Sequence, residues 1–395
     1  MELAFFTETY LPFINGVVTH VHMLKQTFEE MGHEVLVVTV GAEKQDEIIY
    51  EDGVIYVPGI YLKKIYGYRV ATPIDFKRKE LVLDFEPDII HIHNEFGIAE
   101  TGIRAAKKLN VPLIYTLHTE YDEFLFYVSL YGLKNITQSL SLKYFKHFSD
   151  AADVILSPSP KAKNYIKKQG VDKEVIVIDN TVDVEKYKKT EEKEAFRKEF
   201  REKYKLTDQT KAFVFVGRIG DEKNIMELID NFTACDFPRE KAVLFIIGKG
   251  PQEEELKEKI KNNNMEDRII LFGALPNTEI AKHLYAMDYY TTGSVSEMHS
   301  ISMLEAMATG LPALIKLDPP NKDQIKPGIN GYQWKDQDEF KEIFNQVLNY
   351  SPEEHQKFKE AVLKYSAEND RFSQAEKLID IYQKAIDDKK NNINE

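Results

Sequence analysis

Short apolar runs rich in β-branched residues alternate with helical segments along this chain, and this alternation restricts the fold more than any other feature. The first run, residues 2–6 (ELAFF), is followed by a Gly-containing loop, a helix of roughly Val18–Met31 and a second run at 34–40 (EVLVVTV). Strand, helix and strand in this order form the βαβ unit of a parallel sheet. The same pattern continues through apolar runs at 54–57, 88–93, 111–118, 153–158 and 174–180.

A charged segment, residues 186–210, interrupts the alternation, and we expect it to be a mostly helical junction. A second series of apolar runs follows at 212–218, 243–250, 268–275, 289–294 and 312–315. The predicted fold class is therefore α/β, with two doubly wound Rossmann-like domains. A chain of 395 residues is long enough for each domain to have its own core.

The expected boundaries divide the chain into an N-terminal domain (1–185), the junction (186–210), a C-terminal domain (211–370) and a C-terminal helix with a frayed tail (371–395). We expect this last helix to pack back toward the N-terminal domain. Two doubly wound domains in tandem usually hold their ligand in the cleft between them, at the carboxyl ends of the strands.

Composition excludes several classes of protein. A net charge of −13 argues against a general nucleic-acid binder, because phosphate contacts need a basic surface. A single cysteine, Cys235, leaves no internal disulfide framework and fits a reducing cytoplasm. The first residues, MELAFFTETYLPF, lack the basic start of a signal peptide, and no run of about 18 apolar residues predicts a membrane span. Attachment to a membrane surface stays open.

The stretch Ser294–Pro312 combines a polar turn (SVSEMHS) with a helix that has apolar residues at the spacing of a buried face: Ile301, Leu304, Met307 and Ala308. Gly310 followed by Leu-Pro is a helix stop. The N-terminus of such a helix offers unpaired N–H groups and a partial positive charge, which together suit a phosphate group.

Two carboxylates, Glu297 before this helix and Glu305 within it, lie eight residues apart. A carboxylate pair is also the signature of a glycosidase, whose two groups are about 5–10 Å apart. Helical rise separates these two by roughly 10 Å along the axis, with a phosphate seat beside them. Acceptance of hydrogen bonds from sugar and ribose hydroxyls therefore fits them better.

Two cations flank the start of another helix in the second half of the chain. Gly217 and Arg218 end an apolar run, and Lys223 follows close behind. A guanidinium and an ammonium at such a point suit a diphosphate, although two solvated surface charges explain the pattern as well. The later Gly248-Lys-Gly250 turn is a weak signal, because no G-x-G-x-x-G spacing completes it.

In the first half, Gly16 precedes a helix and permits close approach of a ligand to the backbone. His91 and His93 point to one face of a strand, which a metal requires, but no third ligand follows at a matching spacing. A polar network is therefore favoured for this pair. His118 ends an apolar run at the edge where α/β proteins bind ligands, and can serve as a sugar contact or an acid/base.

These residues stand in segments that resemble family 4 retaining glycosyltransferases of the GT-B fold, over nearly the whole length. The segments are FFTETYLPFINGVVTHVHMLKQTFEEMGHEV, HIHNEFG, YTLHTEY, GRIGDEKN, IGKGP, LFGALP and SEMHSISMLEAMATGLP. The R-x4-K and E-x7-E elements are specific in combination. Bacterial diacylglycerol glucosyltransferases share the TYLP-NGV opening and the H-T-x-Y segment.

The resemblance implies a role for each candidate residue. Arg218 and Lys223 would bind the donor diphosphate, Glu297 the hexose hydroxyls and Glu305 the ribose. His118 would contact the transferred hexose near its 6-hydroxyl. The remaining donor contacts would come from Gly16, Gly217 and the backbone N–H groups of His299, Ser300 and Ile301. The family usually has glycine where this chain has Ser300, and that side chain is expected either to crowd the hexose or to demand a different φ.

The implied reaction moves a hexose from a nucleoside diphosphate sugar, UDP-glucose or UDP-N-acetylglucosamine, with retention of the α configuration by front-side displacement. Arg218, Lys223 and the helix N-terminus at 301–303 stand in place of a metal, so no cofactor is expected.

Within the N-terminal domain, which would bind the acceptor, residues 134–173 hold eight Lys and three Asp. Such a segment can contact an anionic membrane. This favours a diacylglycerol or glycolipid acceptor and a cytoplasmic protein peripheral to the inner face of the membrane. A protein or polysaccharide acceptor, or a sugar-nucleotide-binding protein or epimerase, remains as an alternative.

Overall fold

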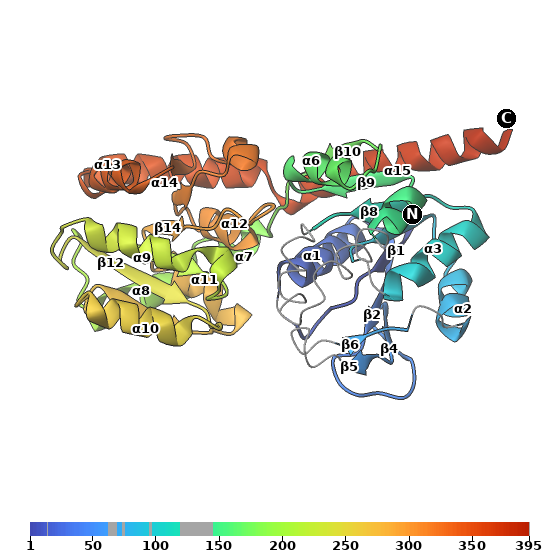
Figure 1. The fold of residues 1–395 in the computed structure, drawn as a ribbon, viewed down its shortest axis with the longest axis horizontal. Helices are drawn as coiled ribbons and strands as arrows, with labels where there is room; N and C mark the ends of the chain where they lie inside the picture. Colours follow the sequence, from blue (N-terminus) through green and yellow to red (C-terminus); the bar gives the residue numbers. More distant parts are fainter. Residues whose placement is uncertain (14, 62–68, 73–75, 95–96, 119–144, 395) are drawn as a thin grey trace. The chain divides into compact units, whose positions relative to one another are not determined.

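The computed structural model describes residues 1–13, 15–61, 69–72, 76–94, 97–118 and 145–394. The chain divides into two compact units (Figure 1). The first unit comprises Met1–Asn180 and Arg371–Glu395, and the second comprises Thr181–Asp370. Each unit is a parallel sheet covered by helices, so the predicted α/β fold with two Rossmann-like domains is confirmed.

The sheet of the first unit has the strand order β10-β9-β8-β7-β1-β2-β4-β3 in the described residues, and every pair is parallel except β3 with β4. The strands are β1 (Glu2–Phe6), β2 (Glu34–Val40), β3 (Ile49–Glu51), β4 (Val54–Val57), β7 (Ile89–Ile92), β8 (Leu113–Thr116), β9 (Val154–Ser157) and β10 (Val175–Val177). A separate antiparallel pair joins β5 (Ile60–Tyr61) to β6 (Arg69–Val70). The helices include α1 (Gly16–Glu30), α2 (Phe76–Asp84), α3 (Gly97–Leu109), α6 (Lys161–Lys168) and α15 (Arg371–Asn394).

The C-terminal helix α15 completes the core of the first unit. Its buried face contributes Leu378 and Tyr382 to the same apolar cluster as Phe5 of β1 and Phe28 of α1. At its start, Arg371 forms an ion pair with Glu30 at 2.6 Å. Helix α3 packs elsewhere on β1, where a Cβ at Gly102 would lie 3.3 Å from the ring of Phe6. Helices therefore cover this sheet on both faces, and α15 is an integral part of the unit.

The sheet of the second unit has the order β13-β12-β11-β14-β15-β16, and all its pairs are parallel. The strands are β11 (Lys211–Val216), β12 (Ala242–Ile247), β13 (Ile269–Gly273), β14 (Tyr289–Thr292), β15 (Ala313–Lys316) and β16 (Gly331–Trp334). The helices are α7 (Val184–Tyr187), α8 (Glu191–Lys203), η1 (Asp221–Lys223), α9 (Ile225–Ala234), α10 (Glu253–Asn262), α11 (Asn277–Tyr285), α12 (Ile301–Ala308), η2 (Pro319–Gln324), α13 (Gln337–Leu348) and α14 (Pro352–Glu368). Successive residues of β11 enter different apolar clusters, Val214 one and Phe215 the other, because helices cover both faces of this sheet.

The charged segment 186–210 is held to the second unit by a buried carboxylate. Asp288, just before β14, accepts hydrogen bonds from Arg197 and Arg201 of α8 at 2.8 and 3.1 Å, and from the backbone N–H of Ala212 at 2.8 Å. Burial alone would raise the pKa of Asp288, but the two guanidinium groups outweigh it and hold this pKa well below its usual value. Two of the charged residues of α8 therefore have a structural partner at the start of β14.

We expect Asp288→Asn to lower the free energy of unfolding at pH 7 by about 3–5 kcal/mol, because it leaves two cations without their buried partner. The native-state pKa lies below the unfolded value, so the stabilisation is present above about pH 4 and is lost as the pH falls through the native pKa. Chemical denaturation at pH 7 and at pH 3 measures both effects. Asp267→Asn, which removes an exposed carboxylate 3.9 Å from Arg268, is the matched control and should change little. Equal losses in the two variants would contradict this account.

Candidate functional site

Helix α12 begins and ends with local signals that its sequence carries. The hydroxyl of Ser300 caps the N-terminus by accepting from the backbone N–H of Met303, and Gly310 has φ +85° just past the C-cap residue Thr309. Ser300 itself has φ −68° and ψ 115°, an ordinary extended conformation. The side chain at 300 thus demands no unusual φ, and it has a capping role. Of the apolar residues expected to face the core, Ile301 is only half-buried.

The turn before α12 brings Glu297 against Lys223 across 74 residues of sequence. The Lys223 ammonium donates to Glu297 Oε1, and the two groups form an ion pair. Burial by itself would lower the pKa of Lys223, but the Glu297 carboxylate outweighs it and the pKa lies above its usual value. Lys223 is therefore a fixed cation, with its charge balanced by the acid that the sequence pointed to.

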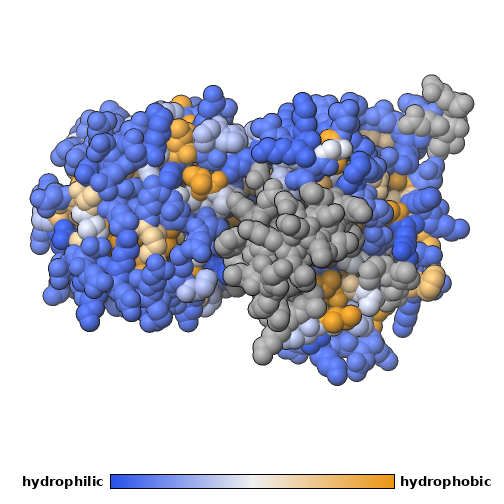
Figure 2. All heavy atoms as spheres, in the orientation of Figure 1, coloured by the Kyte–Doolittle hydropathy of each residue, from blue (hydrophilic) through white to orange (hydrophobic). Residues whose placement is uncertain are grey.

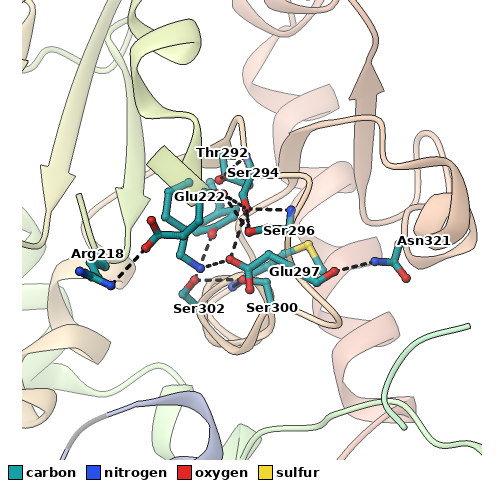
Figure 3. A network of polar contacts seen from close by, with 12 residues as sticks. Arg218, Glu222, Thr292, Ser294, Ser296, Glu297, Ser300, Ser302 and Asn321 are labelled. Carbon is teal, nitrogen blue, oxygen red and sulfur yellow. Dashed lines mark hydrogen bonds and ion pairs between the residues drawn. The ribbon is translucent and has the colours of Figure 1, made fainter. Parts of the chain in front are cut away.

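Two serines fasten this turn to the segment that carries Lys223. Ser294 and Ser296 both donate from their hydroxyls to the backbone carbonyl of Glu222, at 3.2 and 2.8 Å. On the other side, the amide of Asn321 donates to the carbonyl of Glu297 at 2.8 Å. Figure 3 shows Ser294, Ser296 and Glu297 close to this segment, with Asn321 on the opposite side of Glu297, at the right. Side-chain hydrogen bonds to backbone carbonyls therefore fix the turn on both sides, and this fixed turn positions the Glu297 carboxylate.

Arg218 lies next to the same segment but on the far side of Glu222. Its Nη1 is 3.7 Å from Glu222 Oε1, and the side chain is more than a third exposed. Helix α9 does not start at Lys223, because Asp221–Lys223 form the short turn η1 and Asn224 adopts φ +49° before α9. Arg218 precedes η1 and Lys223 is its last residue, and each cation already has a carboxylate neighbour.

A second glycine-containing turn, Gly248-Lys-Gly250, packs closely against the backbone on either side of Arg218. A Cβ at Gly248 would lie 1.8 Å from the carbonyl oxygen of Gly217, and one at Gly250 would lie 2.1 Å from that of Ile219. The Gly248-Lys-Gly250 sequence therefore has a packing reason. Any residue with a side chain at Gly248 would push away the backbone that presents Gly217 and Arg218.

Glu305 is buried within α12 and has a partner that sequence patterns did not indicate. The hydroxyl of Tyr187, at the end of α7, donates to Glu305 Oε1 at 2.6 Å. The residue is 8% exposed, and burial raises the pKa of Glu305 above its usual value although the Tyr187 hydrogen bond lowers it in part. The only sequence signal for Tyr187 is Asp183, the N-cap residue of α7, which predicts a helix there but not its contact.

A short chain of hydroxyls joins the start of α12 to β14. Tyr290 Oη lies 3.0 Å from Ser302 Oγ, and Ser302 Oγ lies 3.1 Å from Ser300 Oγ. His299 and Ser300 are both buried, with 7% exposure. The first turn of α12 is thus rigidly supported beneath the backbone N–H groups that the sequence predicts for donor binding.

The candidates of the first unit lie at the starts and ends of its elements. Gly16 is the first residue of α1, whose N-terminus is capped by the Asn15 side chain accepting from Val18 N at 2.9 Å. His93 directly follows β7, and His118 lies two residues after the end of β8. The rings of His91 and His93 lie on one face as predicted, with centroids 4.1 Å apart.

His91 belongs to a polar network. Its Nδ1 lies 2.7 Å from the Tyr382 hydroxyl, and its Nε2 lies 2.7 Å from Thr116 Oγ1. His93 Nδ1 lies 3.0 Å from His118 Nε2, and His20 of α1 packs against both rings. Burial lowers the pKa of His20 to about 4, and burial is also the main reason that the pKa of His93 and of His118 is well below the usual value. All these rings are neutral at pH 7.

Comparisons with known proteins identify the family of the chain. Residues 14–186 match the family described as Glycosyltransferase Family 4, and residues 196–365 match Glycosyl transferases group 1. An alpha-monoglucosyldiacylglycerol synthase of Streptococcus pneumoniae is 28% identical over 372 residues, covering 93% of this chain and 83% of the relative. A GDP-mannose-dependent alpha-mannosyltransferase of Mycobacterium tuberculosis is 25% identical over 335 residues, covering 84% of this chain and 83% of that protein.

Solved structures with the same fold include Anabaena HepE in complex with UDP and glucose, with a TM-score of 0.71 and 15% identity, covering 97% of this chain and all of that one. Sucrose-phosphate synthase from Thermosynechococcus elongatus has a TM-score of 0.74 and 14% identity, covering 97% of this chain and 98% of that one. Two Rossmann-like units that match these two family models define a GT-B glycosyltransferase, an enzyme that moves a hexose from a nucleoside diphosphate sugar. More particularly, the chain belongs to glycosyltransferase family 4.

Tyr187 positions Glu305, which is expected to bind the ribose of the donor. We therefore expect Tyr187→Phe to raise the KM for the sugar nucleotide roughly tenfold with a smaller change in kcat, because a hydrogen bond to a charged group contributes about 1.5–3 kcal/mol. Loss of this donor raises the pKa of Glu305 further, so the defect should deepen as the pH is lowered from 8 to 6. Tyr350→Phe removes a hydroxyl that is bonded to Tyr332 and Gln346 instead, and serves as the control. A KM equal to that of the wild type at both pH values would show that Tyr187 does not position Glu305.

Proposed function

We propose that this enzyme transfers glucose or N-acetylglucosamine from the corresponding UDP-sugar to diacylglycerol or a glycolipid at a membrane surface, with retention of the α configuration. The observation that carries the donor half of the proposal is the Lys223–Glu297 ion pair beside the N-terminus of α12. The names of relatives such as the pneumococcal synthase support the acceptor half.

The diphosphate end of the donor would lie at the cations. Negative charge develops on the leaving diphosphate, and donors that are already in place stabilise it without reorganisation. Lys223 stays protonated and Arg218 keeps its charge at any physiological pH. The backbone N–H groups of His299, Ser300 and Ile301, at the first turn of α12, add the positive end of a helix dipole.

The hexose would be held by Glu297, whose carboxylate accepts hydrogen bonds from sugar hydroxyls. Without a donor, Lys223 neutralises this carboxylate. A bound diphosphate would share the ammonium, so Glu297 gains freedom to accept from the hexose when the phosphates arrive. In the same proposal, the Glu305 carboxylate accepts hydrogen bonds from the ribose hydroxyls. Because Glu305 is buried, an unpaired carboxylate oxygen is costly, and a ribose supplies two hydroxyl donors.

Gly16 and His118 complete the proposed donor contacts. The neutral ring of His118 can donate to or accept from a hexose hydroxyl, which suits the contact near the 6-hydroxyl that the family resemblance implies. Gly16, as the first residue of α1, has no side chain between the helix N-terminus and a phosphate oxygen. Front-side displacement, in which the leaving phosphate takes the acceptor proton, needs no further base.

Two surface features of the first unit support contact with a membrane, where a lipid acceptor would lie. Lys163, Lys167 and Lys168 are exposed on α6, whereas Lys161 is buried and Lys146 pairs with Asp150. Residues 134–144 of the predicted basic segment lie outside the described residues. Exposed apolar side chains include Ile60 and Tyr61 of β5 at 61% and 54%, and Figure 2 shows apolar residues gathered near this hairpin. In the described residues, no helix is long and apolar enough to cross a bilayer.

We expect Lys223→Ala to lower kcat by about 10²–10³-fold with little effect on the fold, because it removes a fixed donor to the leaving group. UDP release with saturating donor measures kcat, and circular dichroism checks the fold. Lys257→Ala removes a Lys that is paired with Glu253 and Glu254 on the exposed face of α10, and is the control. Near-normal turnover by Lys223→Ala would remove Lys223 from the mechanism.

The acceptor is tested by sugar transfer from UDP-glucose, UDP-N-acetylglucosamine and GDP-mannose to diacylglycerol in anionic vesicles, with soluble glycans and peptides in parallel. We expect a glycolipid product from a UDP-sugar. Transfer to a glycan or peptide alone would favour the alternative acceptors, and transfer from GDP-mannose alone would correct the donor.

Membrane contact has its own prediction. Replacing Lys163, Lys167 and Lys168 by Ala should weaken flotation with anionic vesicles roughly 100-fold at low salt, since each Lys near such a surface contributes about 1 kcal/mol. The same change at Lys198, Lys357 and Lys364 of the second unit, all exposed, is the control. Undiminished flotation of the first variant would exclude α6 as the contact.

A further inference from the structure

Three histidines that are far apart in sequence meet at one place in the first unit. His20 lies on α1, His93 directly after β7 and His118 two residues after β8. One ring nitrogen of each lies within 4.8 Å of one ring nitrogen of the other two. Within the part of the chain that the structure describes, no other three His, Cys, Asp or Glu residues come together in this way.

The spacing of these nitrogens suits a metal ion. A tetrahedral Zn²⁺ with Zn–N bonds of about 2.0–2.1 Å places its ligand nitrogens roughly 3.3–3.4 Å apart. His93 Nδ1 and His118 Nε2 already lie 3.0 Å apart. The ring of His20 packs against both, with centroids 5.9 Å from His93 and 5.2 Å from His118. Small side-chain rotations would therefore bring the third nitrogen to a bonding distance.

Hydrogen bonding sets this group apart from its neighbour His91. Both nitrogens of His91 have partners, Tyr382 and Thr116. By contrast, His20 Nδ1 and His93 Nε2 are buried without any hydrogen-bond partner. Leaving a buried polar atom unpaired costs about 1–3 kcal/mol, and native structures seldom do so without a reason. A metal bound at His20 Nδ1 would account for that cost on the His20 ring.

We propose that His20, His93 and His118 form a binding site for a divalent first-row transition metal, with Zn²⁺ as the ion that best fits three imidazoles. Neutral rings are the form that coordinates a metal, and burial favours that form. His118 is the half-buried member, so the fourth position is open to water or another ligand, as in three-histidine zinc sites.

A metal at this place has a consequence that rests on the proposed function. Coordination occupies a nitrogen of His118, the residue proposed to contact the hexose, so Zn²⁺ should inhibit transfer by excluding that contact. The transfer reaction itself uses Lys223, Arg218 and the α12 N-terminus, and does not require the ion. The site is therefore inhibitory.

Metal binding is measured without donor or acceptor, on the full chain free of any histidine tag and pretreated with chelator. Calorimetric titration with Zn²⁺ should give one ion per chain, and Co²⁺ should give the visible absorption of a four-coordinate site. His20→Asn should weaken both by more than tenfold. His22→Asn, on the same helix but bonded to Tyr10, is the matched control and should bind as the wild type does.

Failure to bind Zn²⁺, or binding that His20→Asn leaves unchanged, would overturn the proposal. Circular dichroism checks the fold, and His118→Asn, at a half-buried position, gives the same binding test if His20→Asn does not fold. Transfer assays then compare each enzyme with itself, with Zn²⁺ and with chelator. The wild type should lose activity reversibly in Zn²⁺ and His20→Asn should not. Tight Zn²⁺ binding without inhibition would overturn the inhibitory role, while inactivity in chelator would count against the proposed function instead.

Discussion

The ion pair between Lys223 and Glu297 is the interaction on which the rest of the candidate site depends. It joins the turn η1 after β11 to the turn that leads into α12, and these segments are 74 residues apart in sequence. Two serine hydroxyls hold the same turns together through one carbonyl, that of Glu222. In the structure, the Glu297 carboxylate balances the half-buried ammonium of Lys223. If a donor binds there as we propose, it meets charges that are already in place and only has to redistribute them.

Much of the fold and of the site residues could be predicted from the sequence, because both depend on local signals. The hydrophobic periodicity, the length of the apolar runs and the glycine stops indicated the strands and α12, and the E-x7-E spacing indicated Glu297 and Glu305. Partners could not be predicted in the same way. Tyr187 meets Glu305 across 118 residues, and Asp288 meets Arg197 across 91. Such contacts depend on how elements pack, and a single sequence carries no periodic signal for them.

Two details show how packing changed the interpretation of individual residues. The side chain at Ser300 was expected to crowd the hexose or to require a different φ, yet it takes an extended conformation and caps α12. For His91 and His93 a polar network was expected, and His91 is in one, but spacing along the chain did not indicate the other imidazoles nearby. The third and fourth imidazoles come from α1 and from the end of β8, which the parallel sheet brings to the same place. In both cases the environment of the side chain comes from packing, which spacing along the chain does not indicate.

Helix α15 has a consequence for how the chain folds during synthesis. Residues 181–370 form a continuous unit, but the first unit takes Leu378 and Tyr382 of α15 into the same core as Phe5. The ribosome therefore releases an N-terminal sheet whose apolar face is covered by α1 but still lacks α15 while 190 further residues are made, counted from 181 to 370. Although domains commonly fold in the order of synthesis, the second unit here can finish before the first. During that interval, the incompletely covered sheet is the part of this enzyme most open to chaperones and to aggregation.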